Sequence, residues 1–95
     1  MNDKPPVTVW HNTAAQRYEA TVDGFLAECD YVREGGHLVL THTYVPPEMR
    51  GRGIAEVLVR AALDDARAEG SKVVPACSYV ATFIKRHAEY QSLLA

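Results

Sequence analysis

Thr-Tyr-Val-Pro-Pro-Glu-Met-Arg-Gly-Arg-Gly-Ile-Ala, residues 43–55, decides the fold, because a strand should end in this stretch and a helix should begin. The proline pair has no backbone N–H for a sheet, so strand pairing should stop at Val45 and leave main-chain groups exposed. Gly51 and Gly53 have no Cβ, which lets the backbone turn tightly and approach a bound anion as the helix starts at about Gly53. The stretch therefore predicts a junction that a ligand can approach.

The first turn of that helix is a candidate anion site. Its N–H groups have no partner inside the helix, and the helix dipole is positive at this end. Arg50 and Arg52 place two cationic side chains beside them. These residues predict either a site for a phosphate or pyrophosphate or an ordinary loop between a strand and a helix.

Length and composition indicate one small globular domain. Of the 95 residues, 47% are hydrophobic and 23% are charged, and we expect a flexible tail at 1–6 before a single domain at 7–95. A formal net charge of -2 argues against a nucleic-acid partner. The start of the chain does not resemble a secretory signal, and no apolar run has membrane-spanning length. We therefore expect a cytoplasmic protein without a membrane partner.

Hydrophobic alternation predicts consecutive strands at about residues 7–11, 16–22, 25–33 and 37–44. The dipeptide Asp23-Gly24 between two alternating runs is a strong signal for a two-residue hairpin turn. A Gly-Gly pair marks the next turn. The strands should therefore form an antiparallel meander.

A helix, a fifth strand and a second helix should complete the chain. Residues 53–69 have helical periodicity, with Ile54, Val57, Leu58, Ala61 and Ala62 on an apolar arc and Glu56, Arg60, Asp64 and Arg67 on a solvated face. The strand at 72–77 should lie parallel to the fourth strand, and a short helix should follow at about 79–86. The sequence thus predicts an α+β fold with a mixed sheet. Prolines near the same end of strands four and five should splay them into a cleft.

Two histidines, His37 and His42, lie on the predicted fourth strand. Their odd separation predicts that they point to opposite faces, so they should not bind one metal ion together. His11 and His87 lie far away in sequence, and we expect no metal site. His42 could act as a base near the cleft or be an ordinary strand histidine.

The two cysteines have different predicted roles. Cys29 lies in mid-strand on the face of Phe25 and Tyr31, so we expect a small, buried and unreactive thiol. Cys77 ends the proline-containing strand, and Ser78 could cap the following helix. A helix N-terminus lowers the pKa of a thiol, so Cys77 could be a nucleophile or a ligand contact, or simply a packing residue.

The run RGRGIA, residues 50–55, resembles the Arg/Gln-x-x-Gly-x-Gly/Ala signature of the GNAT superfamily of acetyl-CoA-dependent N-acetyltransferases. The order of a strand, this run, an amphipathic helix, a parallel strand and a second helix resembles the same superfamily. The stretch from about Arg17 to Leu94 is similar to its small single-domain members. They have the wording Val-Pro-Pro-Glu-x-Arg-Gly-Arg-Gly and a cysteine at the position of Cys77.

The resemblance implies that acetyl-CoA is the cofactor. The loop would bind the CoA pyrophosphate through backbone amides, the strand end would pair with the pantetheine arm, and the thioester would lie between the splayed strands. The implied contacts are Tyr44, Val45, Arg50, Gly51, Arg52, Gly53, Ile54 and Ala55, with Ser78 next to the catalytic candidate Cys77. Larger members have a tyrosine that protonates the departing CoA thiolate, and Phe83 occupies the corresponding part of this chain.

Together these features predict an N-acetyltransferase that moves an acetyl group to a small-molecule or peptide amine. Cys77 would accept the acetyl group or help to move a proton. One alternative is a CoA-binding module without turnover, since Phe83 has no hydroxyl and the chain has no early helices to shape an acceptor pocket. Another is a plain anion-binding interaction domain. We expect a monomer or a weak homodimer.

Overall fold

The first four strands form the predicted antiparallel meander. In the computed structural model, which describes residues 7–95, the strands are β1 (Val9–Asn12), β2 (Arg17–Val22), β3 (Phe25–Glu34) and β4 (His37–Tyr44). The expected tail at 1–6 lies outside the described residues. Asp23 and Gly24 have φ angles of 53° and 82°, as a tight turn with both central residues left-handed requires.

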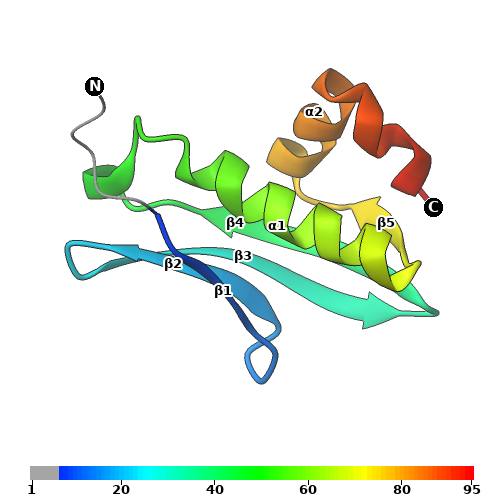
Figure 1. Cartoon of the computed structure of the whole chain (residues 1–95), viewed down its shortest axis with the longest axis horizontal. Coiled ribbons are helices and arrows are strands. Elements are labelled where there is room, and N and C mark those ends of the chain that lie inside the picture. The colour runs from blue at the N-terminus through cyan, green and yellow to red at the C-terminus, as the bar shows by residue number, and fades with distance from the viewer. Residues whose placement is uncertain (1–6) are drawn as a thin grey trace.

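The second half of the chain adds the predicted crossover. Helix α1 (Ile54–Glu69) leads to β5 (Lys72–Pro75), which pairs in parallel with β4 and completes a sheet of order β1-β2-β3-β4-β5. Helix α2 (Ser78–Arg86) follows, and two 3-10 turns, η1 (Pro47–Met49) and η2 (Ala88–Leu93), were not predicted. Figure 1 shows α2 and the C-terminal end on the side of α1 away from β1. None of the helices in residues 7–95 is long and apolar enough to cross a membrane.

The core lies between α1 and one face of the sheet. Alternate residues of β2, β3 and β4 supply one layer, and α1 supplies the other. The helix buries Ile54, Leu58, Val59, Ala62, Leu63 and Ala66. Cys29 is fully buried, as the sequence predicts. Val57 and Phe25 were expected in this layer but are 37% and 41% exposed, because the buried arc of α1 is rotated toward Val59 and Phe25 stands at the end of its strand.

Two element ends near the proposed cleft differ from the expectation. β4 ends at Tyr44, as predicted, but β5 ends at Pro75, two residues before the predicted end at 77, because proline cannot donate to a ladder. Cys77 has extended backbone and is the N-cap of α2, so the expected cap at Ser78 is wrong. No side-chain cap hydrogen bond is present at this helix start.

A β-bulge interrupts β4 where its pairing with β5 ends. The β4 partners of two adjacent β3 residues are Leu40 and His42, so Thr41 between them is an extra residue. The parallel ladder to β5 stops at the same point, with Leu40 opposite Pro75. Within the described part of the chain, residues 42–44 therefore pair with β3 alone. A cleft between the strands stays a prediction.

The bulge also overturns the expected orientation of two histidines. His37 pairs with Glu34 and His42 pairs with Asp30, and these two β3 residues are an even number of positions apart. His37 and His42 thus share a face, because the extra residue reverses the alternation that their spacing predicts. In residues 7–95 no group of three His, Cys, Asp or Glu side chains could hold a metal ion.

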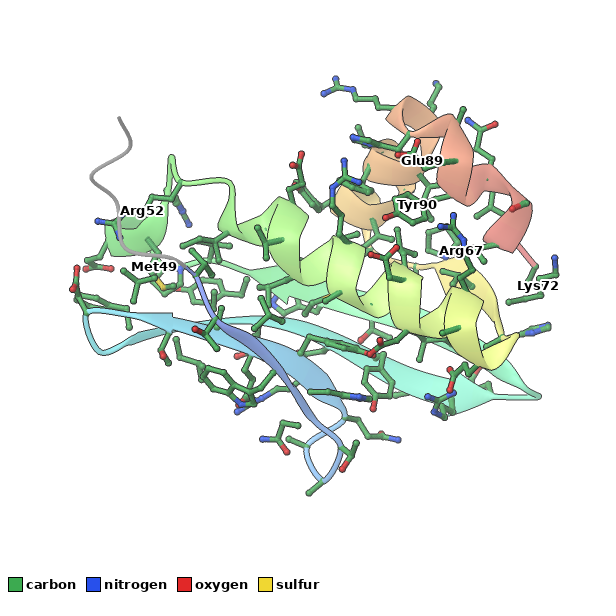
Figure 2. The ribbon with its side chains drawn as sticks, in the orientation of Figure 1. Met49, Arg52, Arg67, Lys72, Glu89 and Tyr90 are labelled. Carbon is green, nitrogen blue, oxygen red and sulfur yellow. The ribbon has the colours of Figure 1, made fainter. Side chains whose placement is uncertain are left out.

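The charged face of α1 is largely solvated, as predicted, with Glu56, Asp64 and Arg67 exposed, but η2 packs against part of it. The Tyr90 hydroxyl donates to Asp64 Oδ1 over 2.7 Å, and Tyr90 is 3% exposed. The Arg67 guanidinium lies 4.9 Å from the centre of the Tyr90 ring, and Figure 2 shows the two side chains next to each other. The helical spacing of these charged residues does not reveal that an aromatic ring from a distant segment packs beside them.

The C-terminal end returns to β5. Leu94 forms a parallel bridge with Val73, and the Ala95 N–H donates to the Val73 carbonyl over 3.0 Å. Leu93 is buried. The segment therefore covers the free edge of β5 as well as one side of α1.

Removal of the Tyr90 ring should destabilise the whole domain. We expect Tyr90→Ala to lower the free energy of unfolding by about 3 kcal/mol, because a buried aromatic ring is lost, and Tyr90→Phe to lower it by about 1 kcal/mol. Urea denaturation measures both values. The exposed Tyr44 is the matched control, and Tyr44→Ala should cost less than about 1 kcal/mol. Equal losses for the two alanine variants would contradict the packing role of Tyr90.

Candidate functional site

The loop between β4 and α1 is held in place by its own hydrogen bonds and by one buried side chain. Met49 is fully buried, and its N–H donates to the Pro46 carbonyl over 2.9 Å. The Arg50 Nε donates to the Val45 carbonyl over 3.1 Å, so this side chain is tied to the end of β4. Figure 2 shows Met49 and Arg52 together at this end of the molecule. The loop is thus anchored to the core directly before the glycines.

The glycines turn the backbone into the left-handed region. Gly51 and Gly53 have φ angles of 84° and 70°, and a Cβ at either position would meet no atom within 4 Å. Both glycines are therefore required by their backbone conformation and not by crowding from the protein. The open space beside them leaves the backbone accessible to a ligand.

Several backbone N–H groups point out of this turn without a partner. The first helical hydrogen bond runs from the Val57 N–H to the Gly53 carbonyl, over 3.2 Å. Among residues 7–95, no acceptor is found for the N–H groups of residues 51–56. These donors lie at the positive end of a helix of 16 residues. The geometry is that of an anion site.

A pocket of about 140 Å³ opens at these donors. Six of the predicted cofactor contacts line it, namely Val45, Arg50, Gly51, Gly53, Ile54 and Ala55. The other three predicted contacts do not: Tyr44 is 43% exposed, Ser78 is exposed and Arg52 is half-buried. Met49, Glu56 and Tyr79 complete the lining.

A second pocket of about 120 Å³ lies next to the first and shares Glu56 and Tyr79 with it. Its remaining lining comes from α2 and the residue after it, namely Thr82, Phe83, Arg86 and His87. Phe83 is 5% exposed, and its ring stacks on His87 with 4.0 Å between ring centres. The two pockets together form a continuous lining from the glycine loop to the end of α2.

Met49 and Tyr79 belong to this site but were not predicted as contacts. The available signal for Met49 was a single apolar residue inside an otherwise polar loop. Tyr79 lies in the first turn of α2 and is 40% exposed, and it reaches the glycine loop only because α2 folds back beside the start of α1. Burial and the Glu56 carboxylate raise the pKa of the Tyr79 phenol, so it stays protonated near neutral pH.

Cys77 stands where β4 and β5 part. Its N–H donates to the Leu40 carbonyl over 2.9 Å, which is the last backbone bond between the two segments, and its side chain is half-buried. Its Sγ lies 3.7 Å from the Thr43 Oγ1. Cys77 lines neither of the two pockets described above.

The two cysteines have opposite electrostatic environments. Burial acts to raise the pKa of the Cys77 thiol, but hydrogen-bonding groups of Val80, Thr43 and Tyr79 outweigh it, and the net pKa lies below the ordinary value. Burial raises the pKa of Cys29 to about 11. The lower pKa of Cys77 has the direction that its place before a helix predicts. A catalytic role for Cys77 stays a prediction.

Comparison with known proteins agrees with this geometry. A family model described as GCN5-related N-acetyl-transferase matches residues 17–93, which is most of the chain. The chain belongs to this family. The resemblance inferred from residues 50–55 and from the order of elements is thereby confirmed.

Individual proteins that are similar to this chain support the family assignment. Protein NATD1 of Mus musculus is 34% identical over 85 residues, covering 86% of this chain and 77% of the mouse protein. The Homo sapiens protein of the same name is 34% identical, with 86% and 75% covered. The solution structure of a GCN5-like protein from Staphylococcus aureus has the same fold, with a TM-score of 0.74 at 22% identity over 93% of this chain and 87% of that chain.

Cys77 should react faster than Cys29 with iodoacetamide. The thiolate is the reacting form, so the Cys77 rate should reach half of its maximum below the ordinary pKa of a cysteine thiol, and Cys29 should react appreciably only as the pH approaches about 11. Peptide mapping after brief alkylation at several pH values measures both rates. Urea-unfolded protein is the control, in which the two rates should converge. Faster labelling of Cys29 in the folded protein would overturn this prediction.

Proposed function

We propose that this protein binds acetyl-CoA at the junction of β4 and α1 and transfers the acetyl group to an amine. The observation that carries the proposal is the row of unpartnered N–H groups in residues 51–56, which line a pocket at the positive end of α1. Enzymes of the family typically use acetyl-CoA. The acceptor would be a small-molecule or peptide amine.

The residues of the junction fit a pyrophosphate. The N–H groups of residues 51–56 would donate to phosphate oxygens, and the left-handed glycines would let those oxygens approach the backbone closely. Glu56 is the one acidic residue of the lining, and it forms an ion pair with Arg60 at 3.8 Å that reduces its repulsion of an anion. Arg50 and Arg52 would add positive charge, and Arg86 in the second pocket could meet a further phosphate.

The unpaired part of β4 would hold the pantetheine arm. Residues 42–44 pair with β3 only, so their outward main-chain groups can pair with the amides of an extended ligand. Tyr44 and Val45 lie at the end of this edge, and Val45 also lines the first pocket. An arm that follows this edge from the loop passes Thr43, whose hydroxyl faces Cys77.

Cys77 would supply the nucleophile or a proton-transfer group. In the first route, its thiolate attacks the acetyl carbonyl, a new carbon–sulfur bond forms as the bond to the CoA sulfur breaks, and CoA leaves as a thiolate. The acceptor amine then attacks the acetyl-cysteine, an amide bond forms, the amine loses a proton and the Cys77 thiol is regenerated. In the second route, the amine attacks acetyl-CoA directly while Cys77 takes or gives a proton.

Tyr79 would provide the hydroxyl that Phe83 lacks. Phe83 is buried and stacked on His87, so it offers packing but no proton. Tyr79 lines both pockets and holds its proton near neutral pH, so its phenol could protonate a departing CoA thiolate. If neither Tyr79 nor Cys77 supported turnover, the protein would be a CoA-binding module. The absence of a hydroxyl at Phe83 favours this alternative.

The anion site can be tested at Gly53. We expect Gly53→Val to weaken CoA binding roughly tenfold or more, because a branched side chain would stand where phosphate meets the backbone and would disfavour the left-handed turn. Titration calorimetry measures the affinity. Gly70, at the other end of α1, has φ of 77° and equally open space, so Gly70→Val is a matched control that should keep the affinity. Unchanged binding in a folded Gly53→Val protein would overturn the site.

The catalytic role can be tested at Cys77. We expect Cys77→Ala to keep CoA affinity within a few fold, because the phosphate contacts lie on the loop and α1, but to lose most acetyl transfer. Mass spectrometry of candidate amines and peptides incubated with acetyl-CoA measures transfer. CoA should also slow alkylation of Cys77 in the unmutated protein. Full transfer by Cys77→Ala would move the role to Tyr79 or His42, and no transfer by the unmutated protein to any amine would favour the binding module.

A further inference from the structure

The hydroxyl of Thr43 lies between the sulfurs of both cysteines. Thr43 and Cys29 are directly opposite in the β3–β4 ladder, and the Thr43 hydroxyl donates to Cys29 Sγ over 3.8 Å. From the other side, the Cys77 thiol donates to Thr43 Oγ1 over 3.7 Å. Both distances are in the longer range that hydrogen bonds to sulfur have. Three side chains from β3, β4 and the end of β5 thus form one chain of hydrogen bonds.

We propose that this chain reverses its direction when Cys77 loses its proton, so that Thr43 positions the Cys77 thiolate and Cys29 becomes the last donor. The proposal rests on the proposed function, in which Cys77 is the reactive group. It assigns a role to Thr43, for which neither the sequence nor the family assignment predicts one. It also makes Cys29 more than a packing residue.

The chemistry of the three groups requires this reversal. A thiolate has no proton and can only accept, so the bond from Cys77 to Thr43 is lost when Cys77 ionises. A hydroxyl rotates freely and donates one proton, so Thr43 can turn from Cys29 to the new thiolate, which is the stronger acceptor. The Thr43 oxygen is then free to accept the Cys29 S–H. Each group keeps a partner in both states.

Cys29 is suited to the end of the chain because it keeps its proton. It is fully buried, and burial raises its pKa to about 11, so it is a neutral donor across the neutral pH range. Its titratable neighbour on β3 is Asp30, whose charge acts to raise the Cys29 pKa further. A carboxylate at the position of Cys29 would repel the Cys77 thiolate, whereas a buried thiol stabilises it without adding charge.

The surroundings of Cys77 make the hydroxyl important. The groups that lower its pKa are the Val80 and Tyr79 backbone and Thr43, and no charged side chain is among the causes. On α2, Tyr79 in the first turn has a phenol that is neutral near pH 7, and the charged residues Lys85 and Arg86 lie in the last turn. The thiolate therefore depends on dipoles, and loss of one of them should be measurable.

The test is the pH profile of Cys77 alkylation by iodoacetamide in variants of Thr43. We expect Thr43→Val to move the midpoint to higher pH and to slow the reaction at neutral pH roughly tenfold, because the thiolate loses a charge-assisted hydrogen bond. Thr43→Ser should restore the profile. Cys29→Ala should shift it in the same direction by roughly threefold in rate, because only the neutral end of the chain is lost. Thr41→Val is the matched control, since Thr41 is exposed and its hydroxyl donates to the Asp30 carbonyl.

Two results would overturn the proposal. An unchanged profile in Thr43→Val, or in Thr43→Ala if the valine variant does not fold, would show that Thr43 does not stabilise the thiolate. An unchanged profile in Cys29→Ala would show that the chain does not reverse. Alkylation needs no acetyl-CoA, so failure of the proposed function appears as absent acetyl transfer in a protein whose alkylation profiles still respond to Thr43.

Discussion

The constraint on which the rest of this structure depends is the end of pairing between β4 and β5. Pro75 has no N–H, and the bulge at Thr41 shifts the β4 backbone out of register, so the parallel ladder stops at Leu40. The Cys77 N–H then makes the last bond to Leu40. Beyond this point the main-chain groups of β4 that face β5 have no partner on that strand. At the same point Cys77 lies between the sheet and the start of α2.

The same event sets the chemistry of the two cysteines apart. Cys29 lies inside the continuous ladder and is covered by α1 and its neighbours, so burial dominates and its thiol stays neutral. Cys77 lies where the ladder has ended, and the backbone of α2 and the Thr43 hydroxyl outweigh its burial. A difference of position in the sheet thus separates a thiol whose pKa is lowered from one whose pKa is raised, although both residues contact the same hydroxyl.

The C-terminal segment explains how a small domain keeps α2 near the site. Tyr90 packs against Arg67 and Arg60 and donates to Asp64, while Leu94 pairs with β5. These contacts hold α2 between α1 and the last residues of the chain. Tyr79 and Phe83 are thereby kept at the two pockets, so side chains outside the pockets determine the position of their wall.

The order of strands, the hairpin turns, the crossover and the glycine turn at residues 50–55 could all be predicted from the sequence alone. Periodicity, missing N–H groups at prolines and left-handed glycines act within a few residues, so a short window contains the whole physical cause. Only the tertiary structure decided that Thr41 is a bulge, that η2 packs against part of the charged side of α1, that Tyr79 reaches the glycine loop and that Thr43 joins the two thiols. Each of these depends on a contact between residues far apart in the chain, and the strength of such a contact comes from burial and geometry that no local pattern contains.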